Sequence, residues 1–184
     1  MKKGMILLAD GFEESEALVT VDLLRRSQID IDLISMMDSK NVVSAHHIKV
    51  ETDFLISEID YQNYQFLILP GGQAVFHHLQ NDLRVKEMIH FFMNQKRLIA
   101  AICAAPLLLG ELGYLKDKNY ICFKGCEQDA FLGILNKDKD VVCDGNVITA
   151  RSMYYTCDFA LAIIQKLQDA QQAENIRKQI QSKE

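Results

Sequence analysis

The sequence lacks long hydrophobic runs, and this excludes membrane-spanning helices. None of its apolar stretches approaches the roughly 20 residues that such a helix needs. The N-terminal stretch MILLA, residues 5–9, is too short for the hydrophobic region of a secretory signal peptide, and acidic residues follow it at once. We therefore expect a first buried strand at this position, no membrane partner and a cytoplasmic protein.

The sequence also lacks a concentrated basic patch. Its 184 residues carry 20 lysines and arginines against 25 aspartates and glutamates, which gives a formal net charge of −5. The basic residues are scattered along the chain, and the KKG near its start is too short to form a nucleic-acid-binding arm. We expect no nucleic-acid partner.

Cysteine pairs with the spacing of metal or redox sites are absent. The chain has five cysteines and no C-x-x-C pair. Cys122 and Cys126 stand four apart, but no histidine lies near them in sequence to complete a zinc site. A phosphate-binding G-x-x-x-x-G-K loop is missing too. We expect no metal and no cofactor, and we interpret all cysteines except Cys103 as reduced residues that pack, with any further role left open: Cys122, Cys126, Cys143 and Cys157.

What the chain does contain is an alternation of strands and helices. Short apolar runs at residues 4–9, 66–70 and 98–102 predict buried strands, and the alternating run 29–36 predicts another. Helical patterns follow at 10–28 and 82–94. This alternation is typical of βαβ units. We predict one domain over residues 1–184, with an α/β fold in which a doubly wound, mostly parallel sheet has helices on both faces.

Smaller elements complete this prediction. Residues 42–54 and 140–151 have the pattern of hairpins, the second with an Asp-Gly turn. Residues 105–115 predict a short helix with Gly113 at its end. YICF, residues 120–123, predicts a strand, and residues 156–181 predict one long helix. In the first helix, Leu18, Val21 and Leu24 have the spacing of a face that packs on the sheet.

Unusual residues follow three of the predicted strands. Ligands of doubly wound sheets bind beyond the carboxyl ends of the strands, so these residues should meet at one edge. They are Asp10 and Gly11 with the glutamates Glu13, Glu14 and Glu16, then Pro70 with Gly71 and Gly72, and finally Cys103.

Cys103 lies where a buried strand turns into a helix that starts at Ala104. Free amides and the helix dipole at such an elbow would lower the pKa of a thiol and favour the nucleophilic thiolate. The amides of Gly72 and Ala104 together could bind an oxyanion formed at Cys103. The same sequence also fits a Cys103 that only packs at the end of a strand, without reacting. Pro70, Gly71 and Gly72 also fit a turn that binds no ligand.

The glutamates offer a proton partner for the cysteine. A carboxyl group in a closed pocket near a thiolate should have a raised pKa, because burial and a like charge both disfavour its ionisation. Glu13 and Glu14 equally suit the first turn of a helix, where acids are favourable. Periodicity does not choose among the three.

The segments MILLADGFEESEALVTVDLLRR, FLILPGG, LIAAICAAP and ITARSMYYTCDFALAII together resemble the ThiJ/PfpI superfamily, and most closely the subfamily of the Parkinson-disease-linked redox protein. This resemblance implies a flavodoxin-like domain, related to class I glutamine amidotransferases, a homodimer, and a reactive Cys103. It places the partner glutamate at Glu16 and backbone donors at Gly72 and Ala104. It places Glu13 and Gly71 around them.

The resemblance also places residues of the family's dimer region at or near Arg25, Arg26 and His46, so a partner subunit would border the pocket. Three departures stand out. Ala104 replaces the histidine of the protease-like members, which argues against a Cys-His protease. Phe123 and Lys124 stand where the subfamily often has a pocket histidine, and Ser152 and Met153 replace a Gly-Pro pair. His77 and His78 are candidates to replace this pocket histidine, but we expect them on a surface helix.

Two functions compete. In the first, Cys103 and Glu16 convert small α-oxoaldehydes, or their adducts on glycated protein, without a cofactor, as a glyoxalase or deglycase. In the second, peroxide oxidises Cys103 to a sulfinate, and the protein acts as an oxidative-stress sensor or chaperone without enzymatic activity. A third reading assigns binding only. Both of the first two functions depend on the same cysteine.

Overall fold

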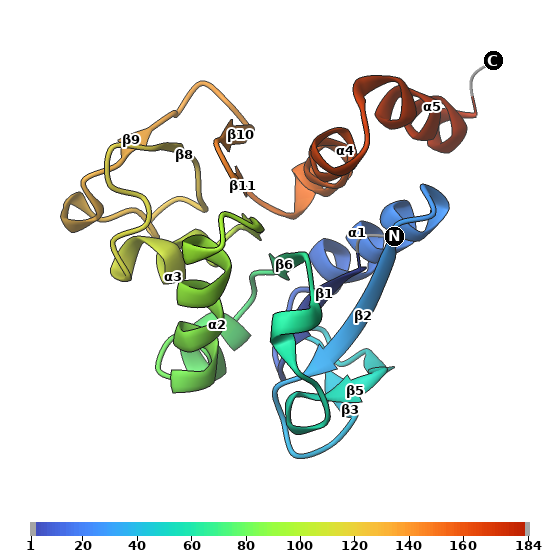
Figure 1. The fold of residues 1–184 in the computed structure, drawn as a ribbon, viewed down its shortest axis with the longest axis vertical. Helices are drawn as coiled ribbons and strands as arrows, with labels where there is room; N and C mark the ends of the chain where they lie inside the picture. The colour runs from blue at the N-terminus through green and yellow to red at the C-terminus, as the bar shows by residue number, and fades with distance from the viewer. Residues whose placement is uncertain (1–2, 183–184) are drawn as a thin grey trace.

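The computed structural model describes residues 3–182, and its centre is a seven-stranded sheet (Figure 1). The strand order is β10-β11-β7-β6-β1-β2-β5, and every neighbouring pair is parallel except β10 with β11. The predicted α/β fold with a mostly parallel sheet is confirmed. The strands are β1 (Lys3–Leu8), β2 (Asp30–Ser35), β5 (Phe54–Leu55), β6 (Phe66–Leu69), β7 (Leu98–Ile102), β10 (Val141–Asp144) and β11 (Val147–Ala150).

Helices cover both faces of the sheet. Figure 1 shows α1, α4 and α5 on one side and α2 with α3 on the other. Their bounds are α1 (Glu14–Arg26), α2 (Leu83–Asn94), α3 (Pro106–Glu111), α4 (Thr156–Leu167) and α5 (Ala170–Gln181). Within residues 3–182, no helix has both the length and the apolar character to cross a membrane.

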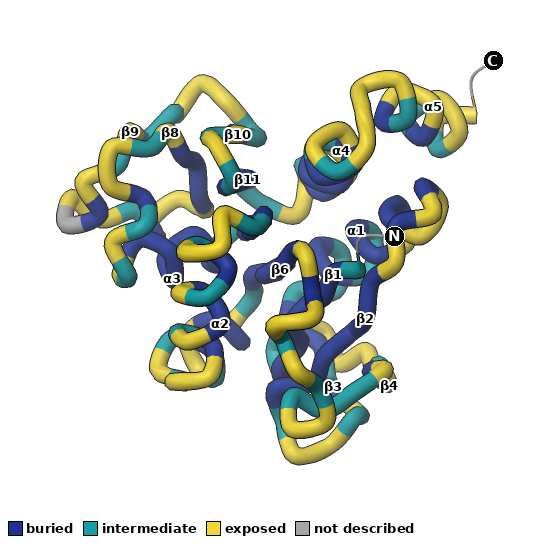
Figure 2. Tube along the Cα trace, viewed as in Figure 1, coloured by how far each residue is buried: buried dark blue, intermediate teal, exposed yellow. Residues whose placement is uncertain are grey.

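The central strands are apolar, apart from Lys3 at the start of β1, because both of their faces are covered. All residues of β6 and β7 are buried, as are the last five of β1, and Figure 2 shows dark blue segments at β6 and β1 in the middle of the molecule. On α1 the buried stripe is Ala17, Val21 and Leu24. Leu18, which we expected to face the sheet, is only half-buried.

Both predicted hairpins are present. β3 (Asn41–Val43) pairs antiparallel with β4 (Lys49–Glu51), and β10 pairs antiparallel with β11 across the Asp-Gly turn. The predicted strand at 120–123 is only partly correct. It shortens to β8 (Asn119–Tyr120), which pairs with β9 (Ile134–Leu135), because the Ile121 N–H bonds to a threonine hydroxyl instead of a strand. The part of the chain that the structure describes also contains five short helical turns: Ile56–Glu58, Tyr61–Asn63, Val75–Leu79, Asp129–Phe131 and Met153–Tyr155.

The long helix predicted over 156–181 is two helices. The Asp169 side chain accepts a hydrogen bond from the Gln172 N–H at 2.8 Å and so begins α5 as an N-cap. Gln168, between the helices, bonds through its side chain to Ser27 at the end of α1. α5 then turns back on α4 with Ala173 and Ile176 buried, so its apolar side is covered within the chain.

Candidate functional site

Cys103 occupies a tight elbow directly after β7. Its φ angle is +63°, a left-handed conformation that is uncommon for any residue with a side chain. The N–H of Cys103 donates to the Ala150 carbonyl at 2.9 Å, and its own carbonyl accepts from the Phe123 N–H at 2.8 Å. The helix begins at Pro106, two residues later than expected. Backbone hydrogen bonds from the neighbouring strand and loop therefore hold the elbow in this conformation.

Glu16 points from the first turn of α1 to the same place. Its side chain is fully buried, and Oε2 accepts a hydrogen bond from the Gly71 N–H at 2.7 Å. Its other oxygen, Oε1, has no hydrogen-bond partner within residues 3–182. A buried carboxyl oxygen without a partner is costly, so this atom is available to a group that enters the site.

The pKa values of the two side chains depend on each other. Burial raises the pKa of the Cys103 thiol, and the nearby Glu16 carboxylate raises it further, whereas the N–H groups of Ala104 and Gly72 lower it by hydrogen bonding to the sulfur. The expected lowering is therefore wrong in its net direction, because the two amides are outweighed. Burial raises the pKa of Glu16 to about 7, against the lowering effect of the Gly71 N–H. Near neutral pH, Glu16 is the group that gains and loses the proton.

The two glycines after β6 leave room for this pair. A Cβ atom on Gly71 would lie 2.6 Å from the Cβ of Cys103 and 2.7 Å from Oε2 of Glu16. Gly72 has a φ angle of +91°, and a Cβ atom there would lie 2.4 Å from the Gly11 carbonyl oxygen. Both positions require glycine, the first for space and the second also for its backbone conformation.

Glu13 acts at the start of α1. Its carboxylate accepts a hydrogen bond from the Glu16 N–H at 2.6 Å as the N-cap of the helix, and its own N–H donates to the Gly71 carbonyl at 3.1 Å. Its negative charge also contributes to the raised pKa of Glu16. Glu13 thus fixes the helix turn that carries Glu16.

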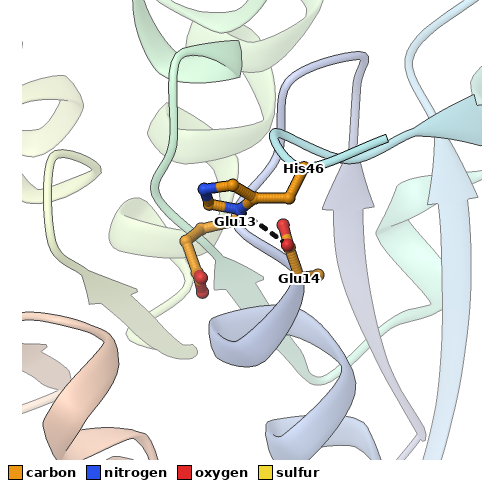
Figure 3. Close-up of side chains that lie close together, drawn as sticks. All are labelled: Glu13, Glu14 and His46. Carbon is orange, nitrogen blue, oxygen red and sulfur yellow. Dashed lines mark hydrogen bonds and ion pairs between the residues drawn. The ribbon is translucent and has the colours of Figure 1, made fainter. Parts of the chain in front are cut away.

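A histidine from the β3–β4 hairpin joins the acidic residues, as Figure 3 shows. The Nδ1 atom of His46 lies 2.7 Å from Oε1 of Glu14. Ligand atoms of Glu13, Glu14 and His46 all lie within 4.8 Å of one another, a set that could hold a cation. Sequence reasoning missed this group because 32 residues separate Glu14 from His46. The His46 side chain is 76% exposed and Glu14 already pairs with it, so we assign the contact to joining the hairpin and α1.

The other residues singled out by sequence lie in several parts of the fold, and among them Phe123 donates its N–H to the Cys103 carbonyl. Arg25 and Arg26 occupy the last turn of α1, roughly 14 Å along the helix from Glu16, where they pair with Asp53 and Asp22. Further along the chain, His77 is exposed and His78 half-buried on a surface turn, as expected. Phe123 and Lys124 are exposed, as is Met153, whereas Ser152 is half-buried. Within the described residues, no histidine takes the place of the expected pocket histidine at Phe123.

Comparison with protein families gives one match that covers most of the chain. The model of the DJ-1/PfpI family matches residues 2–166. Among curated relatives, Protein DJ-1alpha of Drosophila melanogaster is 34% identical over 179 residues, which are 96% of this chain and 82% of that protein. The Parkinson disease protein 7 homolog of Danio rerio is 30% identical over 179 residues, 96% of this chain and 95% of that protein.

Solved structures give the same result. The C103A mutant of a DJ-1 superfamily protein from Salmonella typhimurium superposes with a TM-score of 0.90 at 33% identity and covers all of both chains. Oxidized DJ-1 of Toxoplasma gondii superposes with a TM-score of 0.88 at 26% identity over 98% of each chain. The chain therefore belongs to the DJ-1/PfpI family.

Proposed function

We propose that the protein is a cysteine-dependent stress protein of the cytoplasm that converts small α-oxoaldehydes such as methylglyoxal, or their adducts on protein amines. The observation that supports this most strongly is the set of groups around Cys103. Two backbone N–H groups, from Ala104 and Gly72, point at the sulfur, and a buried acid with a pKa of about 7 lies beside it. An acid or base acts best when its pKa is near the working pH.

The first step joins the sulfur to the aldehyde carbon. As Cys103 Sγ attacks, Glu16 accepts the thiol proton, so no free thiolate needs to accumulate in the buried site. The aldehyde oxygen becomes an oxyanion, which the N–H groups of Ala104 and Gly72 stabilise until Glu16 passes the thiol proton to it and is again a carboxylate. The product is a hemithioacetal.

The second stage moves a proton between the two substrate carbons. Glu16 removes the hydrogen from the former aldehyde carbon to form an enediol, and the neighbouring carbon is then protonated. The aldehyde carbon is oxidised to the level of a thioester while the ketone carbon is reduced to an alcohol, so no outside oxidant or reductant is consumed. Water releases a 2-hydroxy acid and restores the thiol.

Replacement of Cys103 tests this proposal directly. We expect Cys103→Ser and Cys103→Ala to lose methylglyoxal conversion by at least a hundredfold, measured as 2-hydroxy acid formed, since the attacking atom is gone. The control is Cys157→Ser, because Cys157 is an exposed cysteine outside the site, and it should keep full activity. Conversion that survives in Cys103→Ala contradicts the proposal.

The second candidate is a redox sensor or chaperone that needs no turnover. The same N–H groups suit a sulfinate on Cys103, with a protonated Glu16 as donor through Oε1, which has no hydrogen-bond partner within residues 3–182. Two equivalents of peroxide oxidise the thiol to the sulfinic acid and leave two waters. Mass spectrometry after mild peroxide decides: we expect two oxygens on Cys103 before any on Cys122 or Cys143, and the reverse order excludes this candidate.

We also propose a homodimer, as the resemblance implies, with the pocket bordered by the partner subunit. A chain mass of 21.0 kDa makes the outcome easy to read by light scattering after gel filtration. About twice that mass is expected.

A further inference from the structure

A cavity lies beside the Cys103 elbow and is not part of the proposed reaction. It has a volume of about 210 Å³ and is lined by residues from the 121–127 loop, from β9 and beyond, and from the end of β11. We name it the Arg151 pocket, and its lining residues are Ile121, Cys122, Lys124, Glu127, Leu135, Lys137 and Arg151.

The position of the Arg151 pocket is that of a ligand site in this class of fold. Arg151 follows Ala150, whose carbonyl accepts the Cys103 N–H. Phe123, between two lining residues, donates its N–H to the Cys103 carbonyl. The pocket therefore lies at the carboxyl ends of β7 and β11, the edge where doubly wound sheets bind ligands.

Positive charge dominates its lining although the chain as a whole is acidic. Three cations, Lys124, Lys137 and Arg151, face one carboxylate, Glu127. Asp140 lies outside the lining and pairs with Arg151 at 3.0 Å, so one positive charge remains even when Asp140 is counted. The pocket therefore keeps a net positive charge that can attract an anion.

The most important cation is held in place. Arg151 donates from Nε to Asp140, and from one terminal nitrogen to the carbonyls of Lys137 at 2.5 Å and Lys139 at 2.9 Å. A guanidinium fixed in this way loses little further freedom when it binds an anion. Its other terminal nitrogen, Nη1, makes no hydrogen bond within residues 3–182, so two N–H donors remain for carboxylate or phosphate oxygens.

The rest of the lining indicates the size and nature of the ligand. Ile121 and Cys122 are buried and Leu135 is half-buried, so these residues form an apolar wall. A volume of about 210 Å³ lies below the roughly 300–1,000 Å³ that is usual for pockets of drug-sized ligands, so the pocket suits a small ligand. Burial raises the pKa of Cys122 to about 12, so its thiol is a neutral part of this wall.

We propose that the Arg151 pocket binds a small organic anion, a carboxylate or phosphate monoester with a short apolar body. The cations hold the anionic group, and the apolar wall packs against the carbon atoms. This inference does not depend on the proposed reaction at Cys103.

Calorimetric titration tests it with three small probes: sodium lactate, glycerol 2-phosphate and, as a neutral analogue, propane-1,2-diol. We expect the first two, or one of them, to bind with a millimolar Kd or tighter, and the diol not to bind. The stronger anion shows whether carboxylate or phosphate is preferred. No binding of either anion, or equal binding of the diol, overturns the proposal.

Charge variants show where the anion binds. The double change Lys124→Met and Lys137→Met should weaken binding at least tenfold, whereas Lys49→Met with Lys178→Met, two exposed lysines elsewhere, should leave it unchanged. Glu127→Gln should tighten binding several-fold, because it removes the one negative charge of the lining. If the lysines serve only to neutralise Glu127, binding will not respond to any of these changes, and the proposal fails.

A chemical probe gives an independent measurement. Iodoacetate is anionic and iodoacetamide is neutral, and both alkylate cysteine with loss of iodide. Because the Cys122 thiol is buried and neutral near pH 7, both reagents are compared at one alkaline pH, where its thiolate fraction is larger. At equal concentration there, the rate ratio of iodoacetate to iodoacetamide should be higher at Cys122 than at the exposed Cys157 of the same molecule. The lysine double variant should abolish this difference. Equal ratios at the two cysteines in the wild type count against the pocket.

Discussion

At the residue scale, Cys103 and Glu16 compete for one proton in a buried site. Burial disfavours the charged form of each, and the Glu16 carboxylate raises the pKa of Cys103 further. The hydrogen bond from Cys103 lowers the pKa of Glu16 but does not outweigh the effect of burial. The pair therefore prefers to keep a proton, and the carboxyl group releases it first. A nucleophile that is activated only when substrate arrives is also protected from chance modification.

Glu16→Gln separates the two roles of this carboxyl group. Without the negative charge, the pKa of Cys103 should fall, and the midpoint of its alkylation rate against pH should move down by one unit or more. Methylglyoxal conversion should nevertheless fall at least a hundredfold, because the amide takes no proton. Iodoacetamide kinetics and product formation on the same preparation measure both. An unchanged midpoint would show that Glu16 does not govern the thiol.

Gly71→Ala tests how closely the site is packed. The added methyl group would lie 2.6 Å from the Cβ of Cys103 and 2.7 Å from Glu16 Oε2, so one of them must move. We expect a loss of stability of about 1–3 kcal/mol in urea unfolding. Alkylation of Cys103 relative to Cys157 should also change, and Cys157 serves as the internal reference. Normal stability together with normal reactivity would contradict the geometry described here.

The sequence was enough to identify the residues of the site, but not to predict the direction of the thiol pKa shift. The carboxyl-end rule brought Cys103 and the PGG turn together, and the family resemblance chose Glu16 from three acids. The spacing alone could not choose it, because only the folded chain makes Glu13 the N-cap and buries Glu16. The pKa of the thiol was predicted in the wrong direction, since its value depends on burial and on a charge that arrives from another element.

At the scale of elements, the site depends on how strands end and helices begin. β1 leads to the N-cap at Glu13, β6 to the glycine pair, and β7 to the elbow. The apolar runs predicted β1, β6 and β7 from the sequence, and the Asp-Gly turn predicted the β10–β11 hairpin. The division between α4 and α5 was missed, although Asp169 is a good N-cap residue, because the helical composition continues past it.

Asp169→Ala should weaken α5. The side chain of Asp169 accepts a hydrogen bond from the Gln172 N–H, and loss of such a cap costs about 1 kcal/mol. Thermal unfolding should begin at a lower temperature, while reactivity at Cys103 stays normal. Asp138→Ala, in an exposed loop, is the matched control and should leave the melting temperature unchanged. Equal melting temperatures for both variants would mean that α5 does not depend on this cap.

At the scale of the whole molecule, Glu16 makes stability depend on pH. Its pKa rises from 4.5 to about 7 on folding, so the folded state binds the proton more tightly. The stabilisation is complete below about pH 4.5 and is lost as pH rises towards 7, with a total of ~3 kcal/mol.

Glu16→Gln should remove this dependence. Relative to the wild type, the variant should gain stability between pH 5 and pH 8 in urea unfolding, because it has no proton to lose. Glu87→Gln, at an exposed position, should follow the wild type at both pH values. A constant difference between Glu16→Gln and the wild type across this range would show that Glu16 does not titrate on folding.

The left-handed backbone at Cys103 has one more consequence. A side chain with a Cβ atom costs about 1 kcal/mol in that conformation, and glycine adopts it freely. Cys103→Gly should therefore have a larger free energy of unfolding than Cys103→Ala, although both variants lack the reactive sulfur. Homologues that no longer need a reactive cysteine could therefore replace it with glycine without loss of stability. The residue at this position would then indicate which homologues still depend on the thiol.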